Sequence, residues 1–447
     1  MLAINNGKTI KVSKYAMFVP KESGGVIAFS GLTGAIISVD DERYLPTIMN
    51  LREMEAESAF PFDESNEVHQ CLYSNGILVD SKTDEYELVL YTYERRIVRD
   101  QSLNLILITS RQCNLRCVYC YEEHINNHMG SNTYESILQY IEKQLDSKMY
   151  TSVRVSLFGG EPFLPFEKVI TFLRKAKALC DEYRVPFISV ATTNFALVDI
   201  ERLKLLTECG CFLYQVTLDG LANTHNKHRP NVNGSGSFEQ IIKNLRDAKN
   251  SPYNFNVILR TNFNLEIVAD AKNFYEFIKA EFDDPRFSVH FESIKELGGD
   301  NRADMISPDE EANKSREIAK IVSRLRIKNT SADFFSQPFQ GVCYASKHNT
   351  FVIDYDGSVR KCTVMLDSDK NKVGQLLENG EMLISHSENS CWVCKENRLK
   401  SHCKECKILP VCFGGRCAAN VVKNGFDDNC DSEVKIRDVA MMLEYVS

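Results

Sequence analysis

The stretch LNLILITSRQCNLRCVYC, residues 103–120, contains both the first strand expected of this fold and the chemistry expected of this chain. Its mostly apolar run Leu103–Thr109 predicts a buried β-strand. Cys113, Cys117 and Cys120 follow at the spacing Cys-x3-Cys-x2-Cys, and three thiolates so spaced can hold one cubane iron–sulfur cluster whose fourth iron keeps no protein ligand. A structural zinc site normally takes four ligands and disulfides need an even number of cysteines, so neither fits a group of three well. The stretch therefore predicts an iron that is open to a reactant.

A second motif follows after one expected helix and one expected strand. The apolar spacing of Ser131–Ser147 predicts a helix and that of Ser152–Phe158 a strand, which ends in Gly159-Gly160-Glu161-Pro162. In a barrel of parallel strands, the loops that follow the strands share one face, so this turn and the cysteine loop should face each other. Paired glycines let the backbone approach a ligand closely, and a neighbouring carboxylate can hold an ammonium group.

Both motifs resemble those of radical S-adenosylmethionine (SAM) enzymes. In that family the methionyl amine and carboxylate of SAM bind the open iron of a 4Fe-4S cluster, and one electron splits SAM into a 5'-deoxyadenosyl radical that removes hydrogen from a substrate. The protein positions the reactants, because the cofactor carries the difficult chemistry. The resemblance implies that Glu161 holds the methionyl amine, and it implies further SAM contacts from Tyr119, Gly159, Gly160, Thr193, Asn194 and Asn262.

The next hundred residues alternate expected strands and helices. Strands are predicted over Phe187–Thr193, Phe212–Leu218, Phe255–Thr261 and Phe287–Phe291, and helices over Asp199–Glu208, Phe238–Lys249 and Ala269–Phe282. Together with the two strands above, they predict an α/β fold, a partial (β/α)6 TIM-like barrel of the radical SAM type.

Two features at the strand ends are candidates for chemistry. Glu292 is a candidate catalytic base, because forming a bond after hydrogen abstraction usually requires the loss of a proton; its alternative role is a helix cap or a salt bridge. The segment Leu218–Arg229 contains Asp219, His225 and His228. It is similar to a segment of peptide-modifying members of the family, and its alternative interpretation is a solvated loop.

Nine of the sixteen cysteines lie between Cys343 and Cys430. Their order resembles the twitch and SPASM extension of radical SAM enzymes. The resemblance implies a first auxiliary 4Fe-4S cluster on Cys343, Cys362 and Cys417, and a second on Cys403, Cys406, Cys412 and Cys430. The segment Phe351–Arg360, with its Asp356-Gly357 turn, predicts a β-hairpin that delivers Cys362.

The first auxiliary set is one ligand short. Either Cys391 or Cys394 supplies the fourth thiolate, or that iron is open to a substrate atom. A zinc site built from the pairs Cys391-x2-Cys394 and Cys403-x2-Cys406 is the alternative for this region.

The amino-terminal region, residues 1–98, lacks cluster ligands and a glycine-rich phosphate loop. Strands expected around Lys11–Val19, Gly25–Phe29 and Ala35–Val39 resemble a winged-helix-like domain with which peptide maturases bind a leader sequence, by adding it to a sheet edge. A cover for one end of the barrel is the alternative. The expected organisation is this domain, the barrel at 99–300 with a break at Glu296–Asn301, a bridging region at 301–340 and the SPASM domain at 341–447.

Composition limits the classes of partner. The formal net charge of −8 and pI of about 5.7 give no general attraction for nucleic acid. No apolar stretch approaches the ~18 residues of a membrane span and no signal peptide is evident, so a cytoplasmic protein is expected. In a reducing compartment, sixteen cysteines indicate metal binding rather than disulfides.

The resemblance, which spans nearly the whole chain, implies a maturase that acts on a ribosomally made precursor peptide with a leader sequence. Its expected cofactors are SAM and three 4Fe-4S clusters, one for SAM and two auxiliary, with flavodoxin or ferredoxin as electron donor. The expected product is an intramolecular crosslink, a thioether in preference to a carbon–carbon bond. An anaerobic sulfatase maturase that forms formylglycine is the alternative enzyme, and a zinc-binding or redox-sensing scaffold is the alternative of another class.

Overall fold

The computed structural model describes most of the chain. The described residues are 8–22, 24–54, 58–295, 297, 305–330, 337–339, 341–394, 399–415, 417–424, 430, 432–443 and 445. Apart from Leu297, the predicted break at Glu296–Asn301 lies outside these residues.

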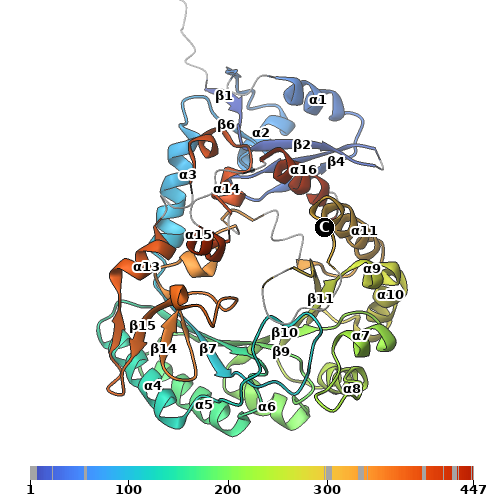
Figure 1. The fold of residues 1–447 in the computed structure, drawn as a ribbon. Coiled ribbons are helices and arrows are strands. Elements are labelled where there is room, and N and C mark those ends of the chain that lie inside the picture. The colour runs from blue at the N-terminus through green and yellow to red at the C-terminus, as the bar shows by residue number, and fades with distance from the viewer. Residues whose placement is uncertain are drawn as a thin grey trace, which may run out of the picture.

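Six parallel strands form a partial barrel in the middle of the chain (Figure 1). Their order is sequential, so each strand pairs with its neighbours in the chain. The strands are β7 (Ser102–Ser110), β8 (Ser152–Gly159), β9 (Phe187–Thr193), β10 (Cys211–Thr217), β11 (Asn256–Phe263) and β12 (Phe287–Ser293). The helices between them are α4 (Ser131–Asp146), α5 (Phe166–Glu182), α6 (Ile200–Glu208), α7 (Ala222–His228), α8 (Phe238–Lys249), α9 (Leu265–Ala269) and α10 (Ala271–Phe282). The predicted α/β partial barrel is confirmed.

Alternation along each strand separates the core from the concave face. In β8, Val153, Val155 and Leu157 are buried among the helices, whereas Arg154 and Ser156 line a cavity on the opposite face. This alternation follows from the two-residue period of a strand. Burying one such Val or Leu side chain contributes about 1.5–3 kcal/mol to folding. This free energy determines that the apolar face of the strand packs against the helices.

The sheet continues past the barrel into the cysteine-rich region. Strand β13 (Thr350–Ile353) pairs in parallel with β7, with Phe351 opposite Leu105. It then pairs antiparallel with β14 (Ser358–Arg360), and β15 (Lys372–Leu376) and β16 (Met382–Ile384) complete a ten-stranded sheet. The predicted hairpin is therefore present, and it extends the barrel sheet as well as delivering Cys362.

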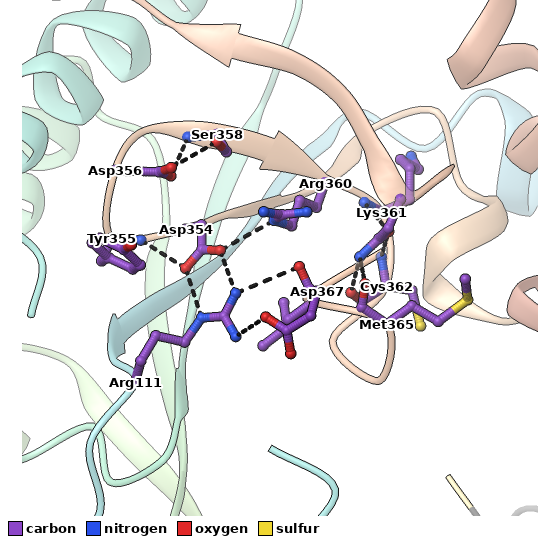
Figure 2. A network of polar contacts seen from close by, with 12 residues as sticks. Arg111, Asp354, Tyr355, Asp356, Ser358, Arg360, Lys361, Cys362, Met365 and Asp367 are labelled. Atoms are coloured by element: carbon purple, nitrogen blue, oxygen red, sulfur yellow. Dashed lines mark hydrogen bonds and ion pairs between the residues drawn. The ribbon is translucent and has the colours of Figure 1, made fainter. Parts of the chain in front are cut away.

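A buried ion network fastens the hairpin to the barrel (Figure 2). The guanidinium of Arg111, directly after β7, donates to both carboxylate oxygens of Asp354 at 3.1 and 2.7 Å and to Asp367 at 3.0 Å. Arg360 Nε donates to Asp354 at 3.1 Å. Because Arg111 and Asp354 are almost fully buried, losing one partner would leave the other charge in a dry environment.

The amino-terminal domain contains two small sheets. One has the order β5-β1-β6 and the other β2-β3-β4. The strands are β1 (Thr9–Val12), β2 (Ala16–Pro20), β3 (Val26–Ser30), β4 (Ile36–Val39), β5 (Phe60–Pro61) and β6 (Leu78–Asp80), and the helices are α1 (Leu45–Glu53), α2 (Glu67–Ser74), α3 (Glu85–Tyr93) and the π-helical turn η1 (Glu94–Val98).

The single strand expected around Lys11–Val19 is wrong in one respect, since a turn divides it into β1 and β2. Ser13 lies in this turn. Its hydroxyl donates to the buried carboxylate of Glu85 at 2.5 Å and accepts from the backbone N–H of Tyr15 at 3.1 Å. These local hydrogen bonds compete with an uninterrupted strand.

The two ends of the chain pack together and close a ring with the barrel (Figure 1). Met17, Ile27 and Phe29 of the amino-terminal sheet share a core with Val411 and Leu443. The carboxy-terminal elements are α11 (Pro308–Arg324), η2 (Tyr344–Ser346), η3 (Asp369–Asn371), α13 (His386–Val393), η5 (Ser401–Glu405), α14 (Leu409–Cys412), α15 (Ala418–Asn424) and α16 (Ser432–Leu443). Within the described residues, every helix is too short or too polar to cross a membrane.

Candidate active site

A cavity of about 140 Å³ lies at the carboxyl ends of strands β7 to β10. This is the face on which parallel barrels carry their chemistry. The lining residues are Cys113, Cys117, Tyr119, Cys120, Tyr121, Glu122, His124, Gly159, Gly160, Thr192, Thr193, Asn194, Thr217 and Arg229. The structure therefore brings together the cysteine loop and the glycine pair, as the barrel argument predicts.

The cysteine loop is tied to the segment that follows α7. The backbone N–H groups of Arg116 and Val118 donate to the carbonyls of Pro230 and His228 at 2.8 and 2.9 Å. Burial raises the pKa of all three cysteine thiols, that of Cys120 to about 11. A positively charged metal centre would offset this cost, since thiolates bound to metal are deprotonated.

Gly159 and Gly160 let the β8 turn lie against the cysteine loop. Gly159 has φ of +118°, and a Cβ at either glycine would collide with the backbone carbonyl of Ser110 or Gln112. The backbone N–H groups of Gly160 and Glu161 donate to these same two carbonyls at 2.9 Å. Any side chain here would push the two loops apart, so the glycines are required by packing.

Glu161 lies behind the cavity and organises the end of β9. Its carboxylate accepts hydrogen bonds from the hydroxyl of Thr193 at 2.8 Å and from the backbone N–H groups of Asn194 and Phe163 at 2.8 and 3.1 Å. Burial raises its pKa to about 7. Glu161 is not among the residues that line the cavity, so the expected contact with the methionyl amine stays a prediction. Its observed contacts position Thr193 and Asn194.

A polar network fixes the inner wall of the cavity. The hydroxyl of Tyr119 donates to Asp219 and accepts from Arg229 at 2.6 Å and from Asn262 Nδ2 at 3.1 Å. The backbone N–H of Asn262 donates to Asp219 at 2.8 Å. Burial raises the pKa of Asp219, and Arg229 opposes that shift. The resemblance predicts Tyr119 and Asn262 as SAM contacts but assigns no role to Arg229 or Asp219. The sequence feature that could have identified these two residues is the polar segment Leu218–Arg229, which follows β10.

The buried wall retains hydrogen-bonding atoms without protein partners. These atoms are Arg229 Nε, Glu122 Oε2 and His124 Nδ1, all on residues that line the cavity. A buried unsatisfied polar atom is costly, so such atoms indicate a site for a ligand or an ordered water. A zwitterionic ligand with a carboxylate and amine or hydroxyl donors suits this set, and SAM has these groups.

A second group of cysteines surrounds a much smaller cavity. Cys403, Cys406, Cys412 and Cys430 line a space of about 20 Å³ together with apolar side chains and Lys435. The ammonium of Lys435 lies 3.8 Å from Cys430 Sγ, and the backbone N–H of Gly415 donates to Cys412 Sγ at 3.1 Å. These are the four residues that the resemblance assigns to the second auxiliary cluster.

A third group of cysteines lies beside the hairpin that extends the sheet. Cys343 and Cys417 both lie within electrostatic range of the buried Cys362. Helix α13, which contains the exposed Cys391 and ends at Val393 directly before Cys394, packs against η2 and α15, the elements that follow Cys343 and Cys417. Across the described ranges, no three His, Cys, Asp or Glu side chains converge as one metal ion would require; the cysteines are instead spread around the cavities.

Lys361 holds the segment between Cys343 and Cys362. Its buried ammonium donates to the carbonyls of Lys347 and Thr350 at 2.7 Å each. Burial lowers its pKa to about 7.

Glu292 and the two histidines are engaged with the protein. Glu292 forms an ion pair with Lys295 at 2.6 Å, and its pKa is lowered although burial opposes the shift. That pairing favours the salt-bridge role over the catalytic base, which stays a prediction. His225 accepts from the backbone N–H of Asp219 at 3.2 Å and contacts Ser237 Oγ at 3.1 Å, and His228 lies 3.4 Å from Glu266. Both histidines therefore anchor the loop after β10.

Comparison with known proteins assigns the family. Residues 107–278 match the Radical SAM superfamily. This chain is a radical SAM enzyme. SAM and the radical SAM 4Fe-4S cluster are its cofactors. The fold is the partial barrel of this family, with a small amino-terminal β domain and a cysteine-rich carboxy-terminal region.

Three similar proteins cover most of this radical SAM enzyme. It is 25% identical over 358 residues to the serine-type anaerobic sulfatase-maturating enzyme of Bacteroides thetaiotaomicron, a match that covers 72% of this chain and 82% of that relative. The structure of anSMEcpe with bound AdoMet and Cp18Cys peptide has a TM-score of 0.59 at 20% identity and covers 77% of this chain and 96% of its own. The structure of Streptococcus suis SuiB bound to precursor peptide SuiA has a TM-score of 0.51 at 16% identity and covers 94% of this chain and 100% of its own.

Proposed function

We propose that this radical SAM enzyme is a peptide maturase that removes a hydrogen atom from a ribosomally made precursor and installs an intramolecular crosslink. One observation carries the proposal: the polar cavity at the cysteine loop adjoins a second cavity inside the barrel, and Thr192 lines both. Tyr344 and Thr363, which follow Cys343 and Cys362, also line this second cavity. A substrate held there would lie near both cysteine sites.

Cys113, Cys117 and Cys120 would hold the SAM-binding cluster, and Arg229 would receive the methionyl carboxylate. When bound, the cluster and SAM supply a 5'-deoxyadenosyl radical. The chain orients the reactants: Glu161 fixes Thr193 and Asn194, and Asp219 fixes Tyr119 and Asn262.

The cysteine-rich region would hold two auxiliary 4Fe-4S clusters. The enclosed set Cys403, Cys406, Cys412 and Cys430 supplies four ligands and leaves little room for a reactant, which suits electron transfer. The set Cys343, Cys362 and Cys417 needs a fourth ligand from Cys391, Cys394 or a substrate thiolate. A substrate thiolate at that position favours a thioether product. Flavodoxin or ferredoxin would supply the electron.

The amino-terminal domain would bind the leader sequence of the precursor. Among the described strands, β4 pairs only with β3 and so presents a free edge. An extended peptide can add to such an edge through main-chain hydrogen bonds. The SuiB structure, which contains a precursor peptide, covers 94% of this chain, whereas the anSMEcpe structure covers 77%. This difference supports a precursor with a leader.

The test is anaerobic reconstitution followed by incubation with SAM, a reductant and the candidate precursor peptide. We expect deoxyadenosine, a peptide that has lost two hydrogens and a cysteine that no longer reacts with iodoacetamide. Deoxyadenosine without any change in the precursor would contradict the maturase assignment. A chain that cleaves no SAM after full reconstitution would contradict the whole proposal.

Maturation of a sulfatase is the second candidate, because the relative from Bacteroides thetaiotaomicron is such an enzyme. A peptide that spans the modified serine or cysteine of a sulfatase separates the two functions. Formation of an aldehyde that reacts with a hydrazide probe would support sulfatase maturation. A crosslinked product from the precursor and no aldehyde from the sulfatase peptide would support the crosslinking maturase.

A further inference from the structure

A cavity of about 230 Å³ lies inside the barrel, on the concave face of strands β7 to β11. Its lining is mostly apolar, with a few polar groups and one cation, the side chain of Arg154 on β8. A concave apolar pocket with a few convergent polar groups is the usual form of a ligand site. We infer that this cavity binds a carboxylate of the substrate peptide through Arg154, an inference that rests on the proposed function and names the chemistry of its substrate.

Arg154 differs from the other arginines that face the interior. Arg111 pairs with Asp354 and Asp367, and Arg229 with Tyr119 and Asp219. Arg260 donates to Asn262 at 2.8 Å. Arg154, by contrast, makes no hydrogen bond and no ion pair with any residue that the structure describes.

The environment of Arg154 favours an anionic ligand. Arg154 is exposed to solvent in the open cavity, although the protein atoms around it displace part of its water and lower its pKa. Its guanidinium is therefore accessible to an entering ligand and, among the described residues, has no carboxylate beside it. A carboxylate that entered the cavity would form two parallel hydrogen bonds with the guanidinium, the geometry for which arginine is suited.

The position of the cavity indicates what the carboxylate does. Thr192 also lines the SAM cavity, and Tyr344 and Thr363, which also line this cavity, directly follow Cys343 and Cys362 in the chain. The hydroxyls of Tyr344 and Thr363 are 2.8 Å apart, which ties the two cysteine-bearing segments together. A peptide anchored on Arg154 would therefore present a neighbouring residue to both sites. Arg154 acts here as a specificity determinant that sets which residue is modified.

Two peptide groups have this chemistry, an aspartate or glutamate side chain and a carboxy-terminal carboxylate. Three capped probes separate them: acetyl-Gly-Asp-Gly-amide, acetyl-Gly-Asn-Gly-amide and acetyl-Gly-Asn-Gly with a free carboxy terminus. Their affinities for the reconstituted holoenzyme with SAM are measured by saturation-transfer NMR under argon. The test variants are Arg154→Gln and Arg154→Lys. The control is Arg246→Gln, which removes the same charge from Arg246 of the outer helix α8, where it forms an exposed ion pair with Glu281.

We expect wild type and Arg246→Gln to bind one carboxylate probe about tenfold more tightly than the neutral peptide, as a charge-assisted hydrogen bond requires. A preference for the Asp probe identifies a side chain, and a preference for the free terminus identifies the end of the peptide. Arg154→Gln should bind all three probes within about twofold of one another, and Arg154→Lys should keep part of the preference.

Equal affinities of wild type for the three probes, including no detectable binding of any, would overturn the inference. So would an unchanged preference in Arg154→Gln, provided that its iron content and circular dichroism match wild type. The proposed function is judged separately by deoxyadenosine and the modified precursor. Wild type that makes both products without a carboxylate preference would remove this inference alone.

Discussion

Two cysteine sites in this radical SAM enzyme differ in free volume and in the polarity of their surroundings. Three cysteines on the loop after β7 border a cavity of about 140 Å³ with unsatisfied polar atoms on its wall. Four cysteines near the carboxyl terminus surround about 20 Å³ of mostly apolar space. The first site has room for a reactant and unsatisfied polar atoms to orient it, whereas the second has little room. This difference supports the proposed division, in which the first site carries the chemistry and the second transfers electrons.

The largest expected effect comes from the open site. Cys117→Ala should reduce deoxyadenosine formation to background, because two thiolates cannot hold the SAM-binding cluster, and should lower iron by about four of roughly twelve per chain. Chromatography of the reaction and iron analysis measure both. Cys71→Ala, at an exposed cysteine of α2, is the control and should behave as wild type. Normal SAM cleavage by Cys117→Ala would contradict the assignment of the loop after β7 as the site of SAM cleavage.

The enclosed site should give a partial phenotype. Cys412→Ala should also lose about four irons, yet it should still form deoxyadenosine, because the open site lies on a different part of the ring. The crosslinked peptide should disappear, since the surplus electron has no acceptor. Mass spectrometry of the precursor and iron analysis of the variant test this. If Cys412→Ala makes crosslinked peptide at the wild-type rate, the enclosed site has no part in the reaction.

The ion network between the open site and the hairpin should contribute mainly to stability. Asp354→Asn should lower the free energy of unfolding by about 3 kcal/mol, because it leaves the buried Arg111 charge poorly compensated. Urea unfolding of the reconstituted protein measures the change. Asp356→Asn lies two residues away on the same hairpin and should change stability by less than about 1 kcal/mol, because among the described residues the carboxylate of Asp356 hydrogen-bonds only to Ser358. Equal losses in the two variants would show that the network is not the fastening element.

The smallest expected effect concerns Glu161. Glu161→Gln should weaken SAM binding about tenfold, because an amide cannot accept all three of the hydrogen bonds that position Thr193 and Asn194. Calorimetry with the reconstituted enzyme, in the absence of reductant, measures the affinity. Glu167→Gln, on the exposed first turn of α5, should bind SAM as wild type does. Loss of SAM binding far beyond tenfold would support direct contact between Glu161 and the methionyl amine.

Local patterns predicted much of the barrel. The strands expected at Phe187–Thr193 and Phe287–Phe291 match β9 and the first five residues of β12, because apolar periodicity is a property of neighbouring residues. The expected helix Ala269–Phe282 is divided at Asp270, where α9 ends and α10 begins. The resemblance grouped Cys403, Cys406, Cys412 and Cys430, and these four residues line one cavity. Ligation by these residues stays a prediction.

Contacts between distant segments could not be predicted in the same way. Nothing near Phe351 in sequence indicates that it lies opposite Leu105, and nothing near Arg111 indicates Asp354 as its partner. Likewise, the alternation of residues along β8 predicts that Arg154 faces away from the core. The absence of a carboxylate among the residues that line its cavity depends on the other strands and on Tyr344, which are distant in sequence. Such choices depend on which surfaces meet after the chain has closed on itself.

The sequence by itself indicated the family and the order of strands and helices, since spacing and periodicity are local, and the resemblance implied which cysteines would hold each cluster. Only the tertiary structure decided which cysteine group has free volume beside it, that Glu161 organises the end of β9, and that Arg154 makes no hydrogen bond or ion pair with a described residue. The physical reason is that burial and pairing of a charge depend on every segment that packs around it, and these segments lie as far apart as residues 111 and 367.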